Sequence, residues 1–258
     1  MSSFPFMSEL PPYASTLGWD WQRIENPGKS SHGFWIGTDR QGNRWLTKLR
    51  GSFYAYREVV FGRLAQAMNW SCQSSMFIEM DLDSAKILGG RAGDVHAVHW
   101  YMEEHASSSC CVGCVLEPLL GREVRVIEDL LPCKVQHLLD WPKSELAAYI
   151  FGGNEPPGRL ITAEHDFVVI DSEQMFSTGP CLLDAASWLV HPDGSPSLSG
   201  KALSIEVCEQ ISKLRDAVIA QALTVPSEIH IEYRWPIAPK LQQSIEFASA
   251  YVGLHERL

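Results

Sequence analysis

The stretch NRWLTKLRGSFYAYREVVFGRLAQAMNW, residues 43–70, decides the fold that we expect for this chain. It begins with a short run of aromatic and β-branched residues, which predicts a strand, and then changes to helical periodicity. Five residues recur along the helical part at spacings of four and three: Tyr54, Glu58, Phe61, Ala65 and Met68. Glu58 therefore shares a stripe with apolar residues and is expected to face the body of the protein. A carboxylate buried there without a cationic partner would be costly.

The residues before this stretch predict the other half of a β-hairpin. HGFWIGTD (32–39) reads as a strand, and Asp39-Arg40-Gln41-Gly42-Asn43 separates it from the strand that ends near Lys48. Asp, Gly and Asn are typical turn residues, so we expect the two strands to pair through this turn. Residues 1–31 are rich in Pro, Ser and Gly and are expected to be an irregular lead-in.

The residues after this stretch predict two further strands and then a mostly helical part. The strands are expected at 75–82 and 95–103, and a short apolar run at 167–170 predicts a buried strand that ends on Asp171. Helices are expected over 121–131, 144–151 (opening on a Ser144 cap), 203–222 and 239–256. This order predicts an α+β fold with two lobes. Residues 1–104 would form a small antiparallel β-sheet lobe with one helix, and residues 105–258 a mainly helical lobe.

The composition limits the kinds of partner. The chain has 258 residues and a formal net charge of -10, and it lacks a dense basic patch, so we expect no nucleic-acid partner. No apolar run is long enough to span a bilayer and the N-terminus does not resemble a signal peptide. We therefore expect a cytoplasmic protein without a membrane partner.

Seven cysteines in such a chain indicate reduced thiols more than a disulfide framework. Cys111 and Cys114 have the spacing of zinc ligands, but the second pair that would make a zinc site specific is missing. The alternative for the cluster Cys110, Cys111 and Cys114 is a flexible Ser/Cys loop without a metal or redox role.

Three residues stand out together as candidates for phosphate chemistry. Lys48 lies near the end of a strand, Glu58 lies ten residues later on the next helix, and Asp171 follows a buried strand in the second half. A lysine held by a helix glutamate can place its ammonium against the phosphates of a nucleotide, and an aspartate can hold the bridging metal ion. Taken singly, each has an ordinary alternative: a solvated hairpin lysine, a helix residue whose carboxylate reaches solvent, and a strand-end cap.

The arrangement resembles the protein-kinase-like fold, and within it the HipA-like kinases. The strand-lysine-helix-glutamate segment and FVVIDSEQMF (167–176) are the parts that are similar, over roughly residues 32–258. IDSEQMFSTGPCLLDAASWL (170–189) also resembles aminoglycoside-phosphotransferase-type kinases. The resemblance implies ATP and Mg²⁺ as cofactors, with Lys48 on the phosphates, Glu58 holding Lys48, and Asp171 on Mg²⁺. HWYMEEH (99–105) would supply the hinge, so that backbone groups near Glu103 and His105 meet the adenine edge.

The loop GGNEPPGR (152–159) departs from the pattern of these families. They place a catalytic aspartate there and a metal-binding asparagine five residues later, where this chain has Asn154 and Arg159. Asparagine cannot accept the proton of an acceptor hydroxyl, and arginine cannot bind Mg²⁺. Loss of such a base typically costs about 10²- to 10⁴-fold in rate. Glu155 is the nearest carboxylate and could replace the aspartate if the loop shifts by one residue.

Three functions remain open at this point. The first is a nucleotide-binding, pseudokinase-like protein with weak or absent phosphotransfer, which could act through a protein partner. The second is an active phosphotransferase on a protein Ser/Thr or small-molecule hydroxyl, with a non-standard catalytic loop. The third is an interaction module that binds no nucleotide. Lys48, Glu58 and Asp171 favour nucleotide binding over the third, and Asn154 and Arg159 favour the first over the second.

Overall fold

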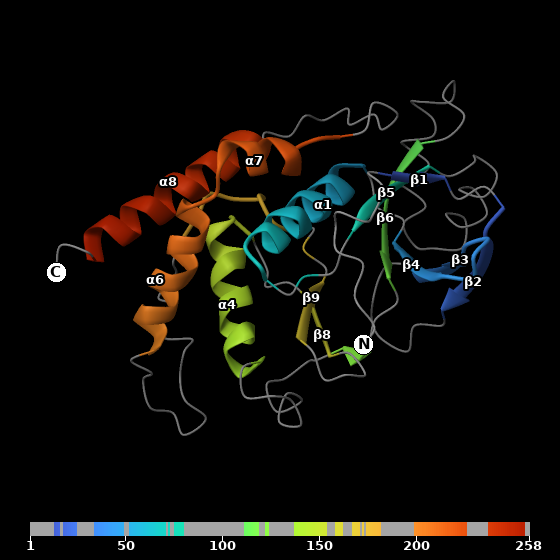
Figure 1. Cartoon of the computed structure of the whole chain (residues 1–258), viewed down its shortest axis with the longest axis horizontal. Helices are drawn as coiled ribbons and strands as arrows, with labels where there is room; N and C mark the ends of the chain where they lie inside the picture. The colour runs from blue at the N-terminus through green and yellow to red at the C-terminus, as the bar shows by residue number, and fades with distance from the viewer. Residues whose placement is uncertain are drawn as a thin grey trace. The chain divides into compact units, whose positions relative to one another are not determined.

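The structure is a computed structural model, and it describes part of the 258-residue chain. The described residues are 13–15, 18–24, 34–48, 52–70, 72, 75–79, 111–118, 122–123, 137–153, 158–161, 167–170, 172, 174–181, 199–225 and 237–255. The protein is of mixed α and β structure (Figure 1). None of the helices in the described ranges is long and apolar enough to cross a membrane.

The chain forms two compact units. Unit 1 comprises Met1–Arg63, Gln73–Leu119 and Thr224–Trp235, and unit 2 comprises Leu64–Cys72, Leu120–Leu223 and Pro236–Leu258. The chain therefore passes from one unit to the other several times. Residues 224–235 are the part of the C-terminal half that belongs to unit 1.

A six-stranded sheet forms the β structure of unit 1, in the order β1-β5-β6-β4-β3-β2 (Figure 1). Its strands are β1 (Tyr13–Ser15), β2 (Asp20–Ile24), β3 (Phe34–Thr38), β4 (Arg44–Lys48), β5 (Met76–Glu79) and β6 (Cys111–Pro118). The β1–β5 pair is parallel and the other pairs are antiparallel. The predicted strand in 75–82 is confirmed as β5, whereas the predicted strand 95–103 lies outside the described residues.

The predicted hairpin is confirmed as β3 and β4, which pair from Phe34↔Lys48 to Thr38↔Arg44. Its turn is organised by the Asp39 carboxylate, which accepts hydrogen bonds from the backbone N–H of Gln41 and Asn43 at 2.9 and 2.8 Å and from the Trp45 indole at 3.1 Å. Burial acts to raise the pKa of Asp39, but these hydrogen bonds outweigh it and the pKa lies below its ordinary value. The turn chemistry read from the sequence is thus the chemistry that closes the hairpin.

Two expectations about the sheet were wrong. The lead-in 1–31 was expected to be irregular, but it contains β1 and β2, which form the two edges of the sheet. The Ser/Cys segment was expected to be a flexible loop, but Cys111–Pro118 is strand β6, which pairs with both β4 and β5. In both cases the strand is stabilised by backbone hydrogen bonds to distant residues, which a local pattern does not reveal. The sheet of unit 1 thereby extends beyond residue 104, where we placed the boundary between the lobes.

The helix predicted from the opening stretch is confirmed as α1 (Ser52–Ala67). Its inward stripe is buried, with Phe61, Leu64 and Ala65 at most 1% exposed. Glu58 is also 1% exposed, as its place on the stripe predicted. α1 spans both units, since residues 52–63 belong to unit 1 and residues 64–67 to unit 2.

Helices form most of unit 2. They are α4 (His137–Ile150), α6 (Ser199–Ser212), α7 (Asp216–Ala222) and α8 (Ile237–His255). Figure 1 shows α6 (orange) packed along α8 (red), with α4 (yellow-green) against α6. The core of this packing consists of Leu146, Ala147, Ile150, Leu203, Val207, Ile211, Leu241 and Ala248, all 5% exposed or less.

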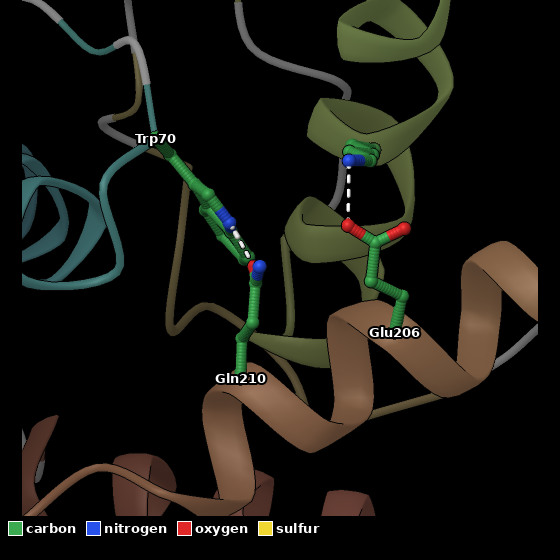
Figure 2. Close-up of polar contacts among 4 residues, drawn as sticks. Trp70, Glu206 and Gln210 are labelled. Carbon is green, nitrogen blue, oxygen red and sulfur yellow. Dashed lines mark hydrogen bonds and ion pairs between the residues drawn. The ribbon is translucent and has the colours of Figure 1, made fainter.

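A polar bridge joins two of these helices on the surface. Lys143 Nζ on α4 lies 2.7 Å from Glu206 Oε1 on α6 (Figure 2). The two side chains are 24% and 48% exposed, so solvent screens the pair and its contribution to stability is small.

The boundaries of three predicted helices differ from the structure. The last helix, expected over 239–256, is confirmed as α8. The helix expected to begin at a Ser144 cap is α4, which begins seven residues earlier, so that Ser144 is buried inside the helix. The helix expected over 203–222 is two helices, α6 and α7, with Arg215 in an extended conformation between them. No Gly or Pro marks this break in the sequence, so local propensity does not reveal it. The prediction of a helix over 121–131 was wrong at Arg122–Glu123, because these two residues form strand β7.

Candidate functional site

The lysine and glutamate predicted to act together lie on consecutive elements of the same unit. Lys48 is the last residue of β4 and is paired with Phe34 of β3 on one side and Val115 of β6 on the other. Only residues 49–51 separate it from the start of α1, and Glu58 is the seventh residue of that helix. The lysine is therefore held on an interior strand, and the glutamate lies about 9 Å along the helix axis from its first residue.

Burial of Glu58 is the chemical feature that stands out in α1. Its side chain is 1% exposed, and its neighbour Arg57 is 4% exposed, so two charged residues of one helix turn are buried together. A buried charge costs several kcal/mol unless it is paired and hydrogen-bonded, roughly as estimated for ions moved out of water. The Glu58 carboxylate therefore lies where a charged group requires a polar or charged partner.

A second sheet, in unit 2, contains the buried strand that was predicted before Asp171. It consists of β7 (Arg122–Glu123), β8 (Gly158–Ile161) and β9 (Phe167–Ile170) in that order. The predicted buried strand is confirmed as β9, with Val168 and Val169 at 4% and 6% exposure. β8 pairs antiparallel with β9, and Gly158 is the partner of Ile170.

The predicted site residues are sequence neighbours of the Gly158–Ile170 pair. Residues 154–157 precede Gly158 in the sequence, and Asp171 follows Ile170. Asn154, Glu155 and Asp171 themselves lie outside the described residues.

Arg159 is not a loop residue. The alignment of the sequence with kinase catalytic loops put it at a metal-binding position in the loop, but it lies in strand β8, opposite Val169 of β9. Val169 also forms a parallel bridge with Cys72, so β9 is bonded along both of its edges at this level.

The end of α4 is hydrogen-bonded to the segment that follows Asp171. Phe176 N–H donates to the Phe151 carbonyl at 2.7 Å, and Cys181 N–H donates to the Tyr149 carbonyl at 3.1 Å. The Gly152 carbonyl accepts two bonds from Thr178, from the backbone N–H at 2.8 Å and from Oγ1 at 3.0 Å. These four bonds fix the segment 176–181 against the C-terminal end of α4.

Side-chain packing stabilises the same junction. Phe151 and Phe176 are both 0% exposed, and their rings meet edge to face with centroids 5.6 Å apart. Aromatic pairs of this geometry contribute about 0.5–1.5 kcal/mol beyond their buried area. Lys240 of α8 donates from Nζ to the Ser177 carbonyl at 2.5 Å. The sequence showed only a Gly/Pro-rich loop and a short strand here, and the Gly152-Gly153 pair after a helix was the one local signal of this cap.

The cysteine cluster does not form the predicted loop. Cys111 and Cys114 are residues of β6. Cys111 pairs with Glu79 of β5, whereas Cys114 lies where the register between the two strands shifts, between Val112 and Val115. Cys110 lies outside the described residues. Within the described part of the chain no three His, Cys, Asp or Glu residues are grouped to hold a metal ion. Cys208 of α6 is buried, which raises the pKa of its thiol to about 12 and makes it a poor nucleophile.

The residues predicted to meet the adenine edge, Glu103 and His105, lie outside the described residues. Strand β6 ends at Pro118, one residue before the Gln73–Leu119 segment of unit 1 passes into unit 2. No protein-family model and no curated protein matches the sequence of this chain.

Proposed function

We propose that this chain is a kinase-fold protein, similar to the HipA-like kinases, that binds ATP and Mg²⁺ and transfers phosphate weakly or not at all. Lys48 is its phosphate-binding cation, Glu58 orients Lys48, and Asp171 is its Mg²⁺ ligand. The observation that carries the proposal is the burial of Glu58 on the helix that directly follows the strand ending in Lys48. A lysine on a sheet strand, paired with a glutamate of the next helix, is the arrangement that protein kinases use on the α- and β-phosphates.

The strand arrangement around Lys48 supports the same proposal. β4 is an interior strand between β3 and β6, and the chain leaves the sheet after β6 to enter unit 2. Backbone groups at the end of β6, near Glu117 and Pro118, are therefore better candidates for the adenine edge than Glu103 and His105. Backbone N–H and C=O groups at a strand end can recognise a flat base without a charged side chain.

The hairpin of β8 and β9 supports the role of Asp171. In its register Gly158 is opposite Ile170, the residue that precedes Asp171 in the sequence. A carboxylate is the ligand type that Mg²⁺ prefers, and the ion would neutralise phosphate charge there. An asparagine opposite it can hydrogen-bond an acceptor hydroxyl but cannot take its proton, so transfer is expected to be slower by about 10²- to 10⁴-fold than with a carboxylate.

A thermal-shift titration of the full chain with ATP and Mg²⁺ tests nucleotide binding. We expect the melting temperature of the wild type to rise with ATP·Mg²⁺, because bound ligand adds RT ln(1 + [L]/Kd) to the free energy of unfolding. Lys48→Met and Asp171→Asn should abolish the rise. Lys213→Met is the matched control, because this exposed lysine pairs with Glu209 of α6, away from the proposed site residues in the sequence. A rise that survives both site substitutions would show that the nucleotide binds elsewhere, and no rise in the wild type would favour the interaction module.

Incubation with γ-labelled and α-labelled ATP then separates the remaining readings. Weak or absent transfer of either label supports the pseudokinase-like reading. Rapid γ-label transfer that is lost in Glu155→Gln would identify an active phosphotransferase in which Glu155 replaces the missing aspartate. Transfer of the α-label would instead indicate nucleotidyl transfer.

A further inference from the structure

A hydrogen bond across 161 residues of sequence anchors the helix that carries Glu58. Arg63 Nη1 on α1 donates to the backbone carbonyl of Thr224 at 2.6 Å. Both residues belong to unit 1, and Thr224 is the first residue of the segment Thr224–Trp235 that the C-terminal half contributes to this unit. The bond therefore ties the helix to the point where the chain re-enters unit 1.

The surroundings of Arg63 make this bond stronger than an ordinary surface contact. Burial lowers the pKa of the Arg63 guanidinium and raises the pKa of the Tyr56 hydroxyl, which lies two helix turns before it on the same face. A partly buried guanidinium has lost some of its hydration, so its hydrogen bond to a carbonyl gains in strength. The donor is charged and the distance is short, as in charge-assisted hydrogen bonds.

Arg63 acts on α1 at a place where it controls the position of Glu58. The two residues are five apart, which separates them by about 7.5 Å along the helix axis and about 140° around it. Arg63 therefore does not occupy the face that Glu58 occupies, and it can fix the rotation and the axial position of the helix without contacting the carboxylate. A buried side chain such as Glu58, at 1% exposure, cannot follow a shift of its helix without repacking its neighbours.

We propose that Arg63 is a positioning residue, which holds α1 in register through the Thr224 carbonyl and so sets Glu58 for its interaction with Lys48. This inference rests on the proposed nucleotide-binding function and adds the means by which the C-terminal segment controls that site. Displacement of the Thr224 carbonyl would change nucleotide affinity by releasing Arg63.

The test uses the full chain with Arg63→Leu, which removes the donors and keeps an apolar stem, and Arg63→Lys, which keeps one charged donor. Arg215→Leu is the matched control, because Arg215 is an exposed arginine whose side chain makes no cap hydrogen bond. Amide hydrogen exchange of the nucleotide-free proteins measures how firmly Arg63 holds α1. The affinity for ATP·Mg²⁺ measures the effect on nucleotide binding. We expect faster exchange in α1 for Arg63→Leu, an intermediate rate for Arg63→Lys, and wild-type rates for Arg215→Leu.

Nucleotide affinity should fall about fivefold or more in Arg63→Leu, at the lower end of typical coupling between sites. A double-mutant cycle with the nearly isosteric Glu58→Gln separates positioning from a general loss of stability. If Arg63 acts through Glu58, the Arg63→Leu substitution has little further effect on affinity once Glu58→Gln is present.

Unchanged exchange in α1, unchanged affinity, or an additive cycle would each overturn this inference. If the wild type itself does not respond to ATP·Mg²⁺, the proposed function fails, and the role of Arg63 in nucleotide binding fails with it. The exchange measurement still decides in that case whether Arg63 anchors α1, so the two failures are distinguishable.

Discussion

The C-terminal ends of α1 and α4 close with the same backbone motif and differ in what they are attached to. After α1, Asn69 adopts a positive φ of 57°, and the N–H groups of Asn69 and Trp70 donate to the carbonyls of Gln66 and Ala65. After α4, Gly152 has a φ of 66°, and the N–H groups of Gly152 and Gly153 donate to Tyr149 and Ala148. Both are Schellman caps, with the left-handed residue directly after the last helical turn.

The surroundings of the two caps explain why one has an asparagine and the other a glycine. Asn69 is exposed, so its side chain has room, and asparagine is the second-best residue for the left-handed conformation. A Cβ on Gly152 would lie 2.3 Å from the Thr178 carbonyl oxygen, which no rotation of a side chain can relieve. The α4 cap is thus joined through its backbone to the segment after Asp171. Beyond the α1 cap, the Trp70 indole N–H donates to the Gln210 side chain on α6 (Figure 2).

The largest effect is expected for Gly152→Ala. The substitution has two costs: a residue with a Cβ is strained in the left-handed conformation, and the Cβ would clash with backbone atoms. We therefore expect a loss of about 3–4 kcal/mol of unfolding free energy, measured by urea denaturation. Gly42→Ala is the control, because Gly42 has a φ of 85° with no atom within 4 Å of the added Cβ. There only the strain remains, about 1–2 kcal/mol. Equal losses at the two positions would mean that the contact between Gly152 and Thr178 is not tight.

A smaller effect is expected for Trp70→Phe. It removes the indole donor to Gln210 and part of a half-buried ring, at a cost of about 1–2 kcal/mol in unfolding free energy. The same measurement in a Gln210→Met background gives the control, because the indole has no acceptor there. We expect the penalty of Trp70→Phe to shrink in that background; an undiminished penalty would assign the whole effect to the ring.

Thr178→Val tests how much the side-chain bond adds to the backbone bonds at the α4 cap. The hydroxyl donates to the Gly152 carbonyl at 3.0 Å, but Thr178 is exposed and the same carbonyl keeps the bond from its N–H. We therefore expect a loss of only about 0.5–1 kcal/mol on unfolding by urea. Thr178→Ser keeps the hydroxyl and should be close to the wild type. A loss in Thr178→Ser as large as in Thr178→Val would show that the methyl group contributes as much as the hydroxyl.

The smallest effect is expected for Asn69→Gly. Glycine removes the remaining left-handed strain but gains conformational freedom in the unfolded chain, and the two changes oppose each other. The free energy of unfolding, obtained from the shift of the thermal midpoint, should change by less than about 0.5 kcal/mol. A loss of more than 1 kcal/mol would show that the Asn69 side chain stabilises the α1 cap by a contact of its own.

The sequence predicted the elements whose cause is local. The 3.6-residue stripe of Tyr54 to Met68 predicted α1 and the inward position of Glu58, because a helix presents every third and fourth residue on one face. The turn residues from Asp39 to Asn43 predicted the β3–β4 hairpin, since the Asp39 carboxylate bonds to its own neighbours. The order of Lys48, Glu58 and Asp171 along the chain supported a nucleotide site on the same local grounds.

The tertiary structure decided what depends on distant partners. β1 exists as an edge strand because it pairs with β5 more than 60 residues away, and β6 is a strand despite its cysteines and Gly113 because β4 and β5 lie on its two sides. The register of β8 on β9, which moves Arg159 out of the loop and brings Gly158 opposite Ile170, was likewise absent from the local pattern. Strand pairing depends on which backbones meet, and residue spacing along one segment does not specify its partner. The sequence by itself therefore determined the elements whose causes are local, and the tertiary structure determined which strands pair and in which register.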